Sequence, residues 1–229
     1  MNVSILGTGM VGRAIAIKLN ELGHSVTIGT RNVEITLSKE EKDGYGNPPF
    51  KVWHAQNQQI KLTSFRDAAQ SADLLFNCTG GMVSINALEM AGEENLQDKL
   101  LIDVANPLDF SQGMPPSLNP VNTDSLGEQI QNRFPDAKVV KTLNTMNAQV
   151  MINPSLIQGD HNVFVCGNDA DAKMQTKAIL QSFGWKENQI LDLGEISNSR
   201  GTEMLLPIWL RLWGTLGTAQ FNFHIQRNP

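Results

Sequence analysis

The feature of this sequence that most constrains its fold is a glycine pattern close to its first residue. An apolar run at residues 2–6 predicts a strand, and it leads directly into the spacing G-x-G-x-x-G. Apolar residues then recur with the period of a helix as far as Leu22, and Gly23 follows as the expected end. A strand, a glycine-rich turn and a helix in this order predict the first unit of a dinucleotide-binding fold. The six residues of the turn are Gly7, Thr8, Gly9, Met10, Val11 and Gly12.

Each glycine of this turn has its own physical reason. Gly7 permits a tight turn, Gly9 lets backbone N–H groups approach a pyrophosphate, and Gly12 lets the helix pack closely on the strand. The N-terminus of the helix adds free N–H groups and the positive end of the helix dipole. A glycine turn that binds nothing is the alternative, but the flanking strand and helix favour the binding interpretation.

The end of the second predicted strand, at residues 25–29, indicates which dinucleotide binds. An NAD site usually carries Asp or Glu there, because a carboxylate accepts hydrogen bonds from the ribose hydroxyls. This chain has Thr30, Arg31 and Asn32 instead. Arg31 can pair with a 2′-phosphate and stack on the adenine, while Thr30 and Asn32 can donate hydrogen bonds. The sequence therefore favours NADP(H) over NAD(H), with a solvated surface arginine as the alternative for Arg31.

Strands and helices alternate along the rest of the chain. This alternation predicts an α/β protein with a doubly wound, mostly parallel sheet, that is, a Rossmann NAD(P)-binding fold. We expect an NADP-binding Rossmann domain at residues 1–154 and a small C-terminal α/β module with a long apolar helix at residues 155–229. The further strands are predicted at 60–62, 72–78, 99–104, 137–141, 162–167 and 190–194, and the helices at 34–42, 65–70, through 87–90, 125–134, 169–183 and from about 201.

Two segments are predicted to be loops. Residues 43–49 are rich in glycine and proline. Residues 106–123 also contain several prolines and show little periodicity, so we predict a long ordered loop near the carboxyl ends of the strands, where loops of this length are often functional. Ser125 and Glu128 then form the pattern of a capping box, which predicts the start of a helix.

Composition excludes several classes of protein. The chain has 229 residues, of which 41% are hydrophobic and 18% are charged, as in an ordinary globular protein. Its net charge of −5 argues against nucleic acid or an anionic membrane surface as a partner. The two cysteines give no disulfide framework, so a reducing compartment is expected.

The most apolar stretch, residues 204–223, is interrupted by Pro207, Arg211 and two glycines. Such interruptions favour a buried helix over a membrane span. Because a strand is predicted from residue 2, we expect no signal peptide. Together these features predict a cytoplasmic protein.

Polar or small residues follow several of the other strands, at the edge where an open sheet binds its ligands. Thr79 and Gly80 leave room for the backbone to approach the nicotinamide ribose. Asn106 and Asn144 could form hydrogen bonds with the carboxamide or with an acceptor. Each of these residues is equally consistent with a turn or a cap.

No residues indicate acid–base, nucleophilic or metal chemistry. The four histidines and two cysteines have no ligand spacing, so no metal is expected, and we predict no catalytic side chain. Hydride transfer needs none, because the cofactor carries the chemistry and the protein positions it. This favours an acceptor that is itself a redox ring over an alcohol or hydroxy acid, whose oxidation benefits from a positioned base.

Several stretches taken together resemble one known family. Across nearly the whole chain they resemble the NADPH-dependent reductases of the 8-hydroxy-5-deazaflavin coenzyme, and they are also similar to the nucleotide domain of the related membrane ferric reductases. The stretches are the glycine turn, GTRN at 29–32, KVVKTLNT at 138–145, VCGND at 165–169, LDLG at 191–194 and SNSR at 197–200.

This resemblance implies hydride transfer between C4 of the nicotinamide and C5 of the deazaflavin, bound face to face in a cleft. It places the pyrophosphate on residues 8–11 and the 2′-phosphate on Thr30 and Arg31. The deazaflavin would lie against the turn at 144–147 and the C-terminal helix. The residues that would line the nicotinamide end are Thr79, Val83 and Ala148.

The chain departs from the family pattern around the acceptor. The archaeal members have a Thr-Ile-Pro-Trp turn where this chain has Cys-Thr-Gly-Gly at 78–81, and His-Thr where it has Asn144-Thr145. The segments at 43–59 and 106–120 are also longer. These changes leave the acceptor open between a deazaflavin and a flavin-like ring, while the dinucleotide site keeps the family pattern.

We therefore predict an NADPH-dependent oxidoreductase that passes hydride to a deazaflavin or flavin-like small-molecule acceptor. Two alternatives stay open: reduction of a small carbonyl or imine anchored by Asn144 or Thr145, and a regulatory protein that binds NADPH without hydride transfer. The C-terminal helix carries apolar residues on more than one stripe, which either pack in the core or form a homodimer face. They are Leu205, Ile208, Trp209, Leu212, Trp213 and Leu216.

Overall fold

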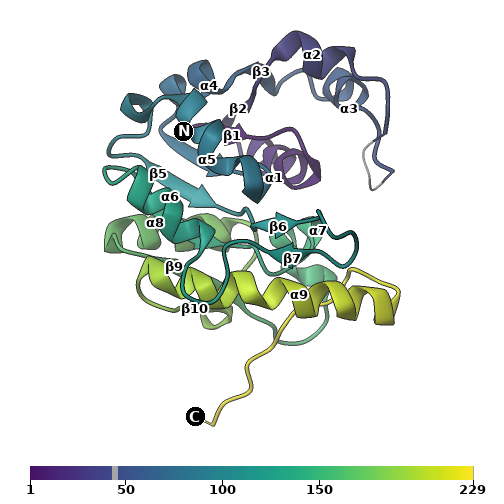
Figure 1. Ribbon diagram of the computed structural model, residues 1–229, viewed down its shortest axis with the longest axis vertical. Helices are drawn as coiled ribbons and strands as arrows, with labels where there is room; N and C mark the ends of the chain where they lie inside the picture. Colours follow the sequence, from purple (N-terminus) through teal and green to yellow (C-terminus); the bar gives the residue numbers. More distant parts are fainter. Residues whose placement is uncertain (43–45, 229) are drawn as a thin grey trace.

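The computed structural model describes residues 1–42 and 46–228, and its centre is a sheet of eight strands (Figure 1). The strand order is β10-β9-β8-β5-β4-β1-β2-β3, and neighbouring strands are parallel except β8 and β9. The predicted fold class, a doubly wound and mostly parallel α/β sheet, is confirmed. The strands are β1 (Asn2–Leu6), β2 (Ser25–Thr30), β3 (Lys61–Ser64), β4 (Leu74–Asn77), β5 (Leu100–Asp103), β8 (Lys138–Thr142), β9 (Val163–Gly167) and β10 (Ile190–Asp192).

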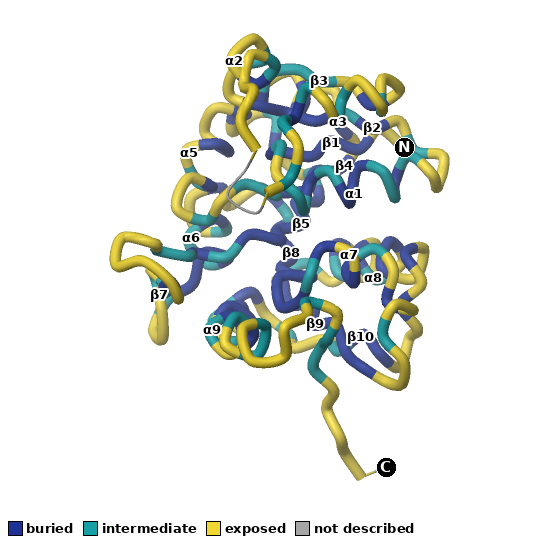
Figure 2. The backbone as a smooth tube through the Cα atoms, turned by 90° about the vertical axis from the view of Figure 1, so that its right-hand side faces the viewer, coloured by how far each residue is buried: buried dark blue, intermediate teal, exposed yellow. Residues whose placement is uncertain are grey.

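Helices cover both faces of this sheet. The apolar cluster on one face includes Leu19 of α1 and Leu180 of α8, and the cluster on the other includes Leu88 of α5 and Ile130 of α6. Figure 2 shows the strands as the buried interior, with exposed backbone along the loops and the C-terminal tail. The helices are α1 (Met10–Glu21), α2 (Val33–Ser38), α3 (Phe50–Gln56), α4 (Phe65–Ser71), α5 (Gly81–Ala91), α6 (Leu126–Arg133), α7 (Ala148–Ile152), α8 (Ala170–Ser182) and α9 (Ser199–Leu216).

The strands that follow residue 155 extend the same sheet as the N-terminal strands. β9 runs antiparallel to β8, with Val165 opposite Thr142, and β10 is parallel to β9. Helix α9 packs against α6, and Asn162 at the start of β9 donates its backbone N–H to Phe223 O of the tail over 2.8 Å. The division of the chain between residues 154 and 155 stays a prediction. Among the described residues, none of the helices is long and apolar enough to cross a membrane.

Helix α6 begins as the capping pattern predicts. Ser125 Oγ accepts a hydrogen bond from the backbone N–H of Glu128 over 3.2 Å. The predicted helix at 34–42 is too long, because α2 ends at Ser38, whose hydroxyl donates to Ile35 O over 3.0 Å. Such local side-chain bonds compete with helix continuation.

The structure also contains short elements that the sequence pattern does not predict. Helices α3 and α7 were not predicted, and residues 108–109 (β6) and 117–118 (β7) pair within the predicted ordered loop. Each is too short for a period of 3.6 or 2 to be recognised. Of the loop predicted at 43–49, residues 43–45 lie outside the described residues.

Candidate functional site

The glycine turn lies where the ends of β1 and β4 meet the start of α1. Gly7 has φ +121°, and a Cβ there would lie 2.5 Å from Cys78 O. A Cβ on Gly12 would lie 2.5 Å from Gly7 O. A Cβ on Gly9 would meet nothing within 4 Å. Gly7 and Gly12 are therefore required by the packing of the chain, whereas Gly9 borders open space.

Gly9 is the N-cap of α1, and the backbone N–H groups of the first helical turn after it have no carbonyl partner within the helix. No side chain caps the helix and no acidic residue lies in its first turn. Five of the nine α-helices that the structure describes have a capping side chain at this position, for example Asn32 in α2 and Asp169 in α8, whereas α3, α5 and α9 lack one as α1 does. The N-terminus of α1 thus keeps its N–H groups and positive dipole end for an anion, as a pyrophosphate requires.

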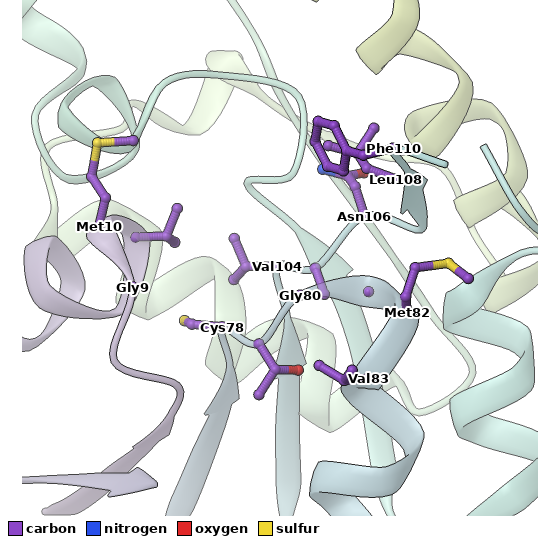
Figure 3. A pocket seen from close by; sticks show the side chains of 14 residues that line it. Gly9, Met10, Cys78, Gly80, Met82, Val83, Val104, Asn106, Leu108 and Phe110 are labelled. Atoms are coloured by element: carbon purple, nitrogen blue, oxygen red, sulfur yellow. The ribbon is translucent and has the colours of Figure 1, made fainter. Parts of the chain in front are cut away.

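A cavity of about 670 Å³ opens beside this turn, at the carboxyl ends of β1, β4 and β5, and we call it the strand-end cavity (Figure 3). Met10 of α1 lies on one side of it, and Met82 of α5 and Phe110 lie on the other. Seven of the predicted site residues line this cavity: Gly9, Met10, Val11, Thr79, Gly80, Val83 and Asn106.

A second cavity, of about 360 Å³, lies on the other side of the glycine turn at the end of β2, and we call it the β2 cavity. Thr79 and Gly80 line both cavities, so the two cavities share part of their wall at this turn. The predicted site residues that line the β2 cavity are Gly7, Thr8, Gly9, Thr30, Arg31, Asn32, Thr79 and Gly80.

Hydrogen bonds restrict what Thr30 and Asn32 can do in the β2 cavity. Thr36 donates its hydroxyl hydrogen to Asn32 O over 2.8 Å, so the 2.7 Å contact between the Thr30 and Thr36 hydroxyls requires Thr30 to donate. Asn32 Oδ1 accepts from Ile35 N over 2.9 Å and caps α2. The donor role predicted for Thr30 is therefore wrong, since its hydrogen is already used within the protein.

Asn144 and Ala148 are buried and do not line the strand-end cavity. Asn144 Nδ2 donates to Asn106 Oδ1 over 3.0 Å, and Asn106 Nδ2 donates to Asn144 O over 2.8 Å. Asn144 therefore acts on the cavity only by holding the amide of Asn106. Ala148 begins the short helix α7, where a small residue packs in the core.

Two cations near the glycine turn were missed by the sequence analysis. Lys39 lines the β2 cavity together with Arg31. It falls within the helix predicted at 34–42, but α2 ends before it, at Ser38. Arg13 donates from Nε to Thr8 O over 2.9 Å and from Nη1 to Pro48 O over 2.7 Å. Its guanidinium also lies over the ring of Phe50, so it ties the glycine turn to α3.

Behind the floor of the strand-end cavity lies a buried ion cluster, which was also missed. Lys141 Nζ lies 2.8 Å from both Asp103 Oδ2 and Glu203 Oε1, and none of the three side chains is exposed by more than 2%. Burial by itself would lower the pKa of Lys141, but the two carboxylates outweigh it and raise this pKa above its ordinary value. Lys141 is therefore a cation.

The strand-end cavity offers little acid–base chemistry. Cys78 is the only titratable side chain among the described residues that line it, and burial raises the pKa of its thiol, with the charge of Asp103 acting in the same direction. Cys78 therefore stays protonated and is a poor nucleophile. Among the described residues, no group of His, Cys, Asp or Glu could hold a metal ion.

Comparison with known proteins gives the family. Residues 2–107 match the family model "NADP oxidoreductase coenzyme F420-dependent". A crystal structure from Arthrobacter sp. FB24, named as a candidate F420-dependent NADP-reductase, is 56% identical with a TM-score of 0.93, over 99% of this chain and 100% of that one. The chain belongs to the F420-dependent NADP oxidoreductase family. By the description of the family model, its members are NADP oxidoreductases.

More distant relatives of this chain include metalloreductases. Metalloreductase STEAP3 of Rattus norvegicus is 26% identical over 211 residues, which are 90% of this chain and 37% of that protein. Metalloreductase STEAP2 of Homo sapiens is 23% identical over 93% of this chain and 37% of its own length. The chain thus spans little more than a third of these relatives.

Imine reductases share the fold. An imine reductase from Myxococcus stipitatus in complex with NADP+ is 15% identical with a TM-score of 0.62, over 94% of this chain and 64% of that one. At this identity the likeness concerns the fold alone.

Proposed function

We propose that this oxidoreductase transfers hydride between NADP(H) and a deazaflavin, with the two reacting rings in the strand-end cavity. The observation that carries the proposal is the chemistry of the cavity wall. Met10 faces the cavity from one side and Met82 and Phe110 from the other (Figure 3), which suits flat rings. The protonated thiol of Cys78 is the only titratable group among the described lining residues, so the wall offers no general acid for a carbonyl substrate.

The chain's own residues position the dinucleotide in this proposal. The pyrophosphate lies against the uncapped N-terminus of α1, where Gly9 borders open space. Arg31 and Lys39 face the 2′-phosphate in the β2 cavity, and Arg13 holds the carbonyl of Thr8 in place. When bound, the nicotinamide supplies the hydride at C4, and solvent supplies the proton that completes the reduced acceptor.

Asn106 is the polar group that can orient a ring in the strand-end cavity. Its Oδ1 accepts from Asn144 Nδ2 and its Nδ2 donates to Asn144 O, which fixes the side-chain amide. One hydrogen of Nδ2 and one lone pair of Oδ1 then remain for a ligand. A fixed amide with one donor and one acceptor fits the paired groups of a nicotinamide carboxamide or a deazaflavin edge.

A deazaflavin is favoured over a flavin by the family and by the Arthrobacter structure at 56% identity. A flavin is the second candidate, because the sequence around the acceptor leaves it open between a deazaflavin and a flavin-like ring. Both are planar rings that accept hydride, so the cavity wall fits either. The experiment must therefore compare them directly.

The purified protein is mixed with NADPH and one of three acceptors: oxidised deazaflavin, FMN or a small cyclic imine. The absorbances of NADPH and of the ring are followed together. We expect equimolar loss of NADPH and oxidised deazaflavin, and slower or no reaction with FMN. Turnover with the imine alone would establish an imine reductase, and tight NADPH binding without turnover of any acceptor would indicate a regulatory protein; either result overturns the proposal.

Phe110 gives a variant matched to the proposed acceptor site. It is 48% exposed and lines the strand-end cavity, so Phe110→Ala is expected to raise KM for the acceptor and leave NADP+ affinity unchanged. Ile225, in the tail, is also 48% exposed and serves as the control. Equal effects of Phe110→Ala and Ile225→Ala on KM would place the acceptor elsewhere.

We also propose that the outer face of α9 forms a homodimer contact. The inner face of α9 buries Leu206 and Trp209, whereas Met204, Ile208 and Leu216 are exposed. Of the apolar residues predicted on this helix, Trp209 is buried whereas Ile208 and Leu216 are exposed, which supports a contact surface on the outer face. Ile208→Glu is expected to convert a dimer to a monomer in analytical ultracentrifugation, and a monomeric wild type would exclude the contact.

A further inference from the structure

A continuous chain of buried hydrogen bonds links the ion cluster to Thr79 at the junction of the two cavities. Asp103 accepts from Lys141 Nζ at Oδ2, over 2.8 Å, and from Asn77 Nδ2 at Oδ1, also over 2.8 Å. Asn77 Oδ1 in turn accepts from Thr79 Oγ1 over 2.7 Å. Asn77, Asp103 and Lys141 have no exposed surface, whereas Thr79 is half-buried and lines both cavities.

The direction of this chain follows from the charge at its buried end. A carboxylate has no hydrogen to donate, so the group of Asn77 that faces Asp103 must be the amide nitrogen. The carbonyl oxygen of Asn77 then faces Thr79. The opposite orientation of Asn77 would place two acceptors 2.8 Å apart in the interior, at the cost of an unmet hydrogen bond.

Thr79 has a single hydroxyl hydrogen, and Asn77 Oδ1 takes it. Ser84 Oγ lies 2.7 Å from Thr79 Oγ1 and 3.3 Å from Gly80 O, so its single hydrogen has two possible acceptors. Because the Thr79 hydrogen goes to Asn77 Oδ1, the short contact between the two hydroxyls contains a hydrogen only if Ser84 donates to Thr79 in preference to the more distant Gly80 O. This leaves Thr79 Oγ1 with one free lone pair and no hydrogen. Toward a ligand, the Thr79 side chain can accept a hydrogen bond but cannot donate one.

We infer that Asp103 and Asn77 are positioning residues that fix Thr79 as a hydrogen-bond acceptor for an O–H or N–H donor on the nicotinamide half of NADP(H). The inference rests on the proposed placement of the nicotinamide in the strand-end cavity. Two groups of that half carry the required hydrogen: the ribose hydroxyls and the carboxamide nitrogen. Phosphate and carbonyl oxygens lack it.

The first test measures NADP+ binding by calorimetry, without any acceptor present. We expect Thr79→Val to weaken NADP+ binding about fivefold to tenfold, the scale of one neutral hydrogen bond, and Thr79→Ser to retain most of it. Binding of adenosine 2′,5′-bisphosphate, which lacks the nicotinamide half, should not change. Unchanged NADP+ binding by Thr79→Val would overturn the inference.

An NADP+ analogue separates the two donors. In 3-acetylpyridine NADP+ a methyl group replaces the carboxamide nitrogen. If the carboxamide donates to Thr79, Thr79→Val weakens NADP+ but not this analogue; if a ribose hydroxyl donates, it weakens both equally. A larger loss for the analogue than for NADP+ would mean that Thr79 does not accept from either group.

The positioning role of Asp103 is tested by non-additivity. Asp103→Asn replaces a group that can only accept with one that can also donate. The hydrogen bonds of Asn77 and Thr79 can then reverse their direction, so the affinity for NADP+ should fall as in Thr79→Val. The double variant Thr79→Val/Asp103→Asn should bind no more weakly than Thr79→Val alone. If the losses of NADP+ affinity in the two single variants add in the double variant, Asp103 has a general structural role, and its assignment as a positioning residue is overturned.

Glu203→Gln is the matched control for the charge change. It also removes a carboxylate 2.8 Å from Lys141 Nζ but lies outside the chain to Thr79. It should lower the melting temperature like Asp103→Asn and leave NADP+ affinity unchanged. If Asp103→Asn does not fold, Asn77→Ser breaks the same link and leaves all three charged residues of the ion cluster in place. Because these readouts are binding constants, failure of deazaflavin turnover would leave the inference standing, and unchanged binding would leave the proposed turnover standing.

Discussion

Lys141 lies directly opposite Asp103 in the register of β8 and β5, and its Nζ reaches 2.8 Å from the carboxylate. Glu203 of α9 approaches the same nitrogen from outside the sheet and also accepts from the backbone N–H of Leu126 and Gly127. One buried lysine therefore joins two strands, the start of α6 and the last helix.

This arrangement predicts a large stability loss when the lysine is removed. Lys141→Met leaves two buried carboxylates without their cation, and we expect a loss of about 3–5 kcal/mol in the free energy of unfolding. Urea denaturation measures it. Lys173→Met, which breaks the partly exposed pair with Asp192, is the control and should cost much less. Similar losses for both variants would show that the cluster is not important for stability.

Stability should also fall at alkaline pH because of buried thiols. Burial raises the pKa of Cys166 in β9 to about 12 from an ordinary value of 9.0, and it raises that of Cys78 in the same direction. The unfolded chain therefore loses these protons first, so stability is complete below pH 9 and decreases above it by about 1.4 kcal/mol per pH unit for each thiol.

The check compares unfolding in urea, with reductant, at about pH 8 and about pH 10. Cys166→Ala should show a smaller loss between these two conditions than the wild type, because one of the shifted groups is gone. The effects of all other groups are common to both proteins and cancel in the comparison. Equal losses would mean that Cys166 ionises normally in the folded state.

Two glycines of the turn should separate binding from folding. Gly9→Ala adds a Cβ that meets no protein atom within 4 Å, so its melting temperature should stay unchanged. The same Cβ enters the space where a pyrophosphate approaches the backbone, and NADP+ binding should weaken about tenfold or more. Gly12→Ala instead places a Cβ 2.5 Å from Gly7 O and should destabilise the fold by about 1–3 kcal/mol.

The control for Gly9→Ala is Gly201→Ala, because a Cβ on Gly201 also meets nothing within 4 Å. This substitution should change neither the melting temperature nor the affinity for NADP+ much. Thermal melting and calorimetry with NADP+ give both readouts for each variant. Full NADP+ affinity in Gly9→Ala would mean that the dinucleotide does not approach this turn.

The sequence predicted those parts of the site that depend on local geometry. The roles of Gly7 and Gly12 follow from a single strand–turn–helix unit, and Arg31 follows the next strand; Gly7 and Arg31 line the same cavity. The ion cluster depends on the pairing of β5 with β8 and on the packing of α9, which no local pattern encodes. Its trace in the sequence is a charged residue in each of two otherwise apolar strands, Asp103 and Lys141.

The prediction that Thr30 donates a hydrogen bond to the ligand is wrong for the same reason, namely that no local pattern encodes the contact. A hydroxyl after β2 is visible in the sequence, but its partner Thr36 is set by where α2 starts. The helix predicted at 34–42 includes Lys39, because the charged run at 39–42 fits a helical pattern. In the structure the backbone becomes extended at Lys39 itself. Of the two cations that line the β2 cavity, Arg31 is predicted by the sequence, whereas Lys39 is found only in the structure.

Those two cations give the sharpest test of nucleotide choice. Arg31→Ala should weaken NADPH binding by about 1.5–3 kcal/mol, roughly tenfold to a hundredfold, because it removes charged hydrogen bonds to the 2′-phosphate. NADH lacks that phosphate and should bind as before. Lys39→Ala should act in the same direction with a smaller effect, since an ammonium binds phosphate as a point charge rather than as a planar fork.

The control for both cations is Arg66→Ala, which removes an exposed arginine paired with Glu94 on α4, away from the β2 cavity. It should change neither NADPH nor NADH affinity in calorimetry. The double variant Arg31→Ala/Lys39→Ala should bind NADPH and NADH with similar affinity, and raising the salt concentration should narrow the wild-type preference because exposed charges are screened. An equal loss of both nucleotides in Arg31→Ala would show that Arg31 contacts a shared part of the dinucleotide and does not recognise the 2′-phosphate.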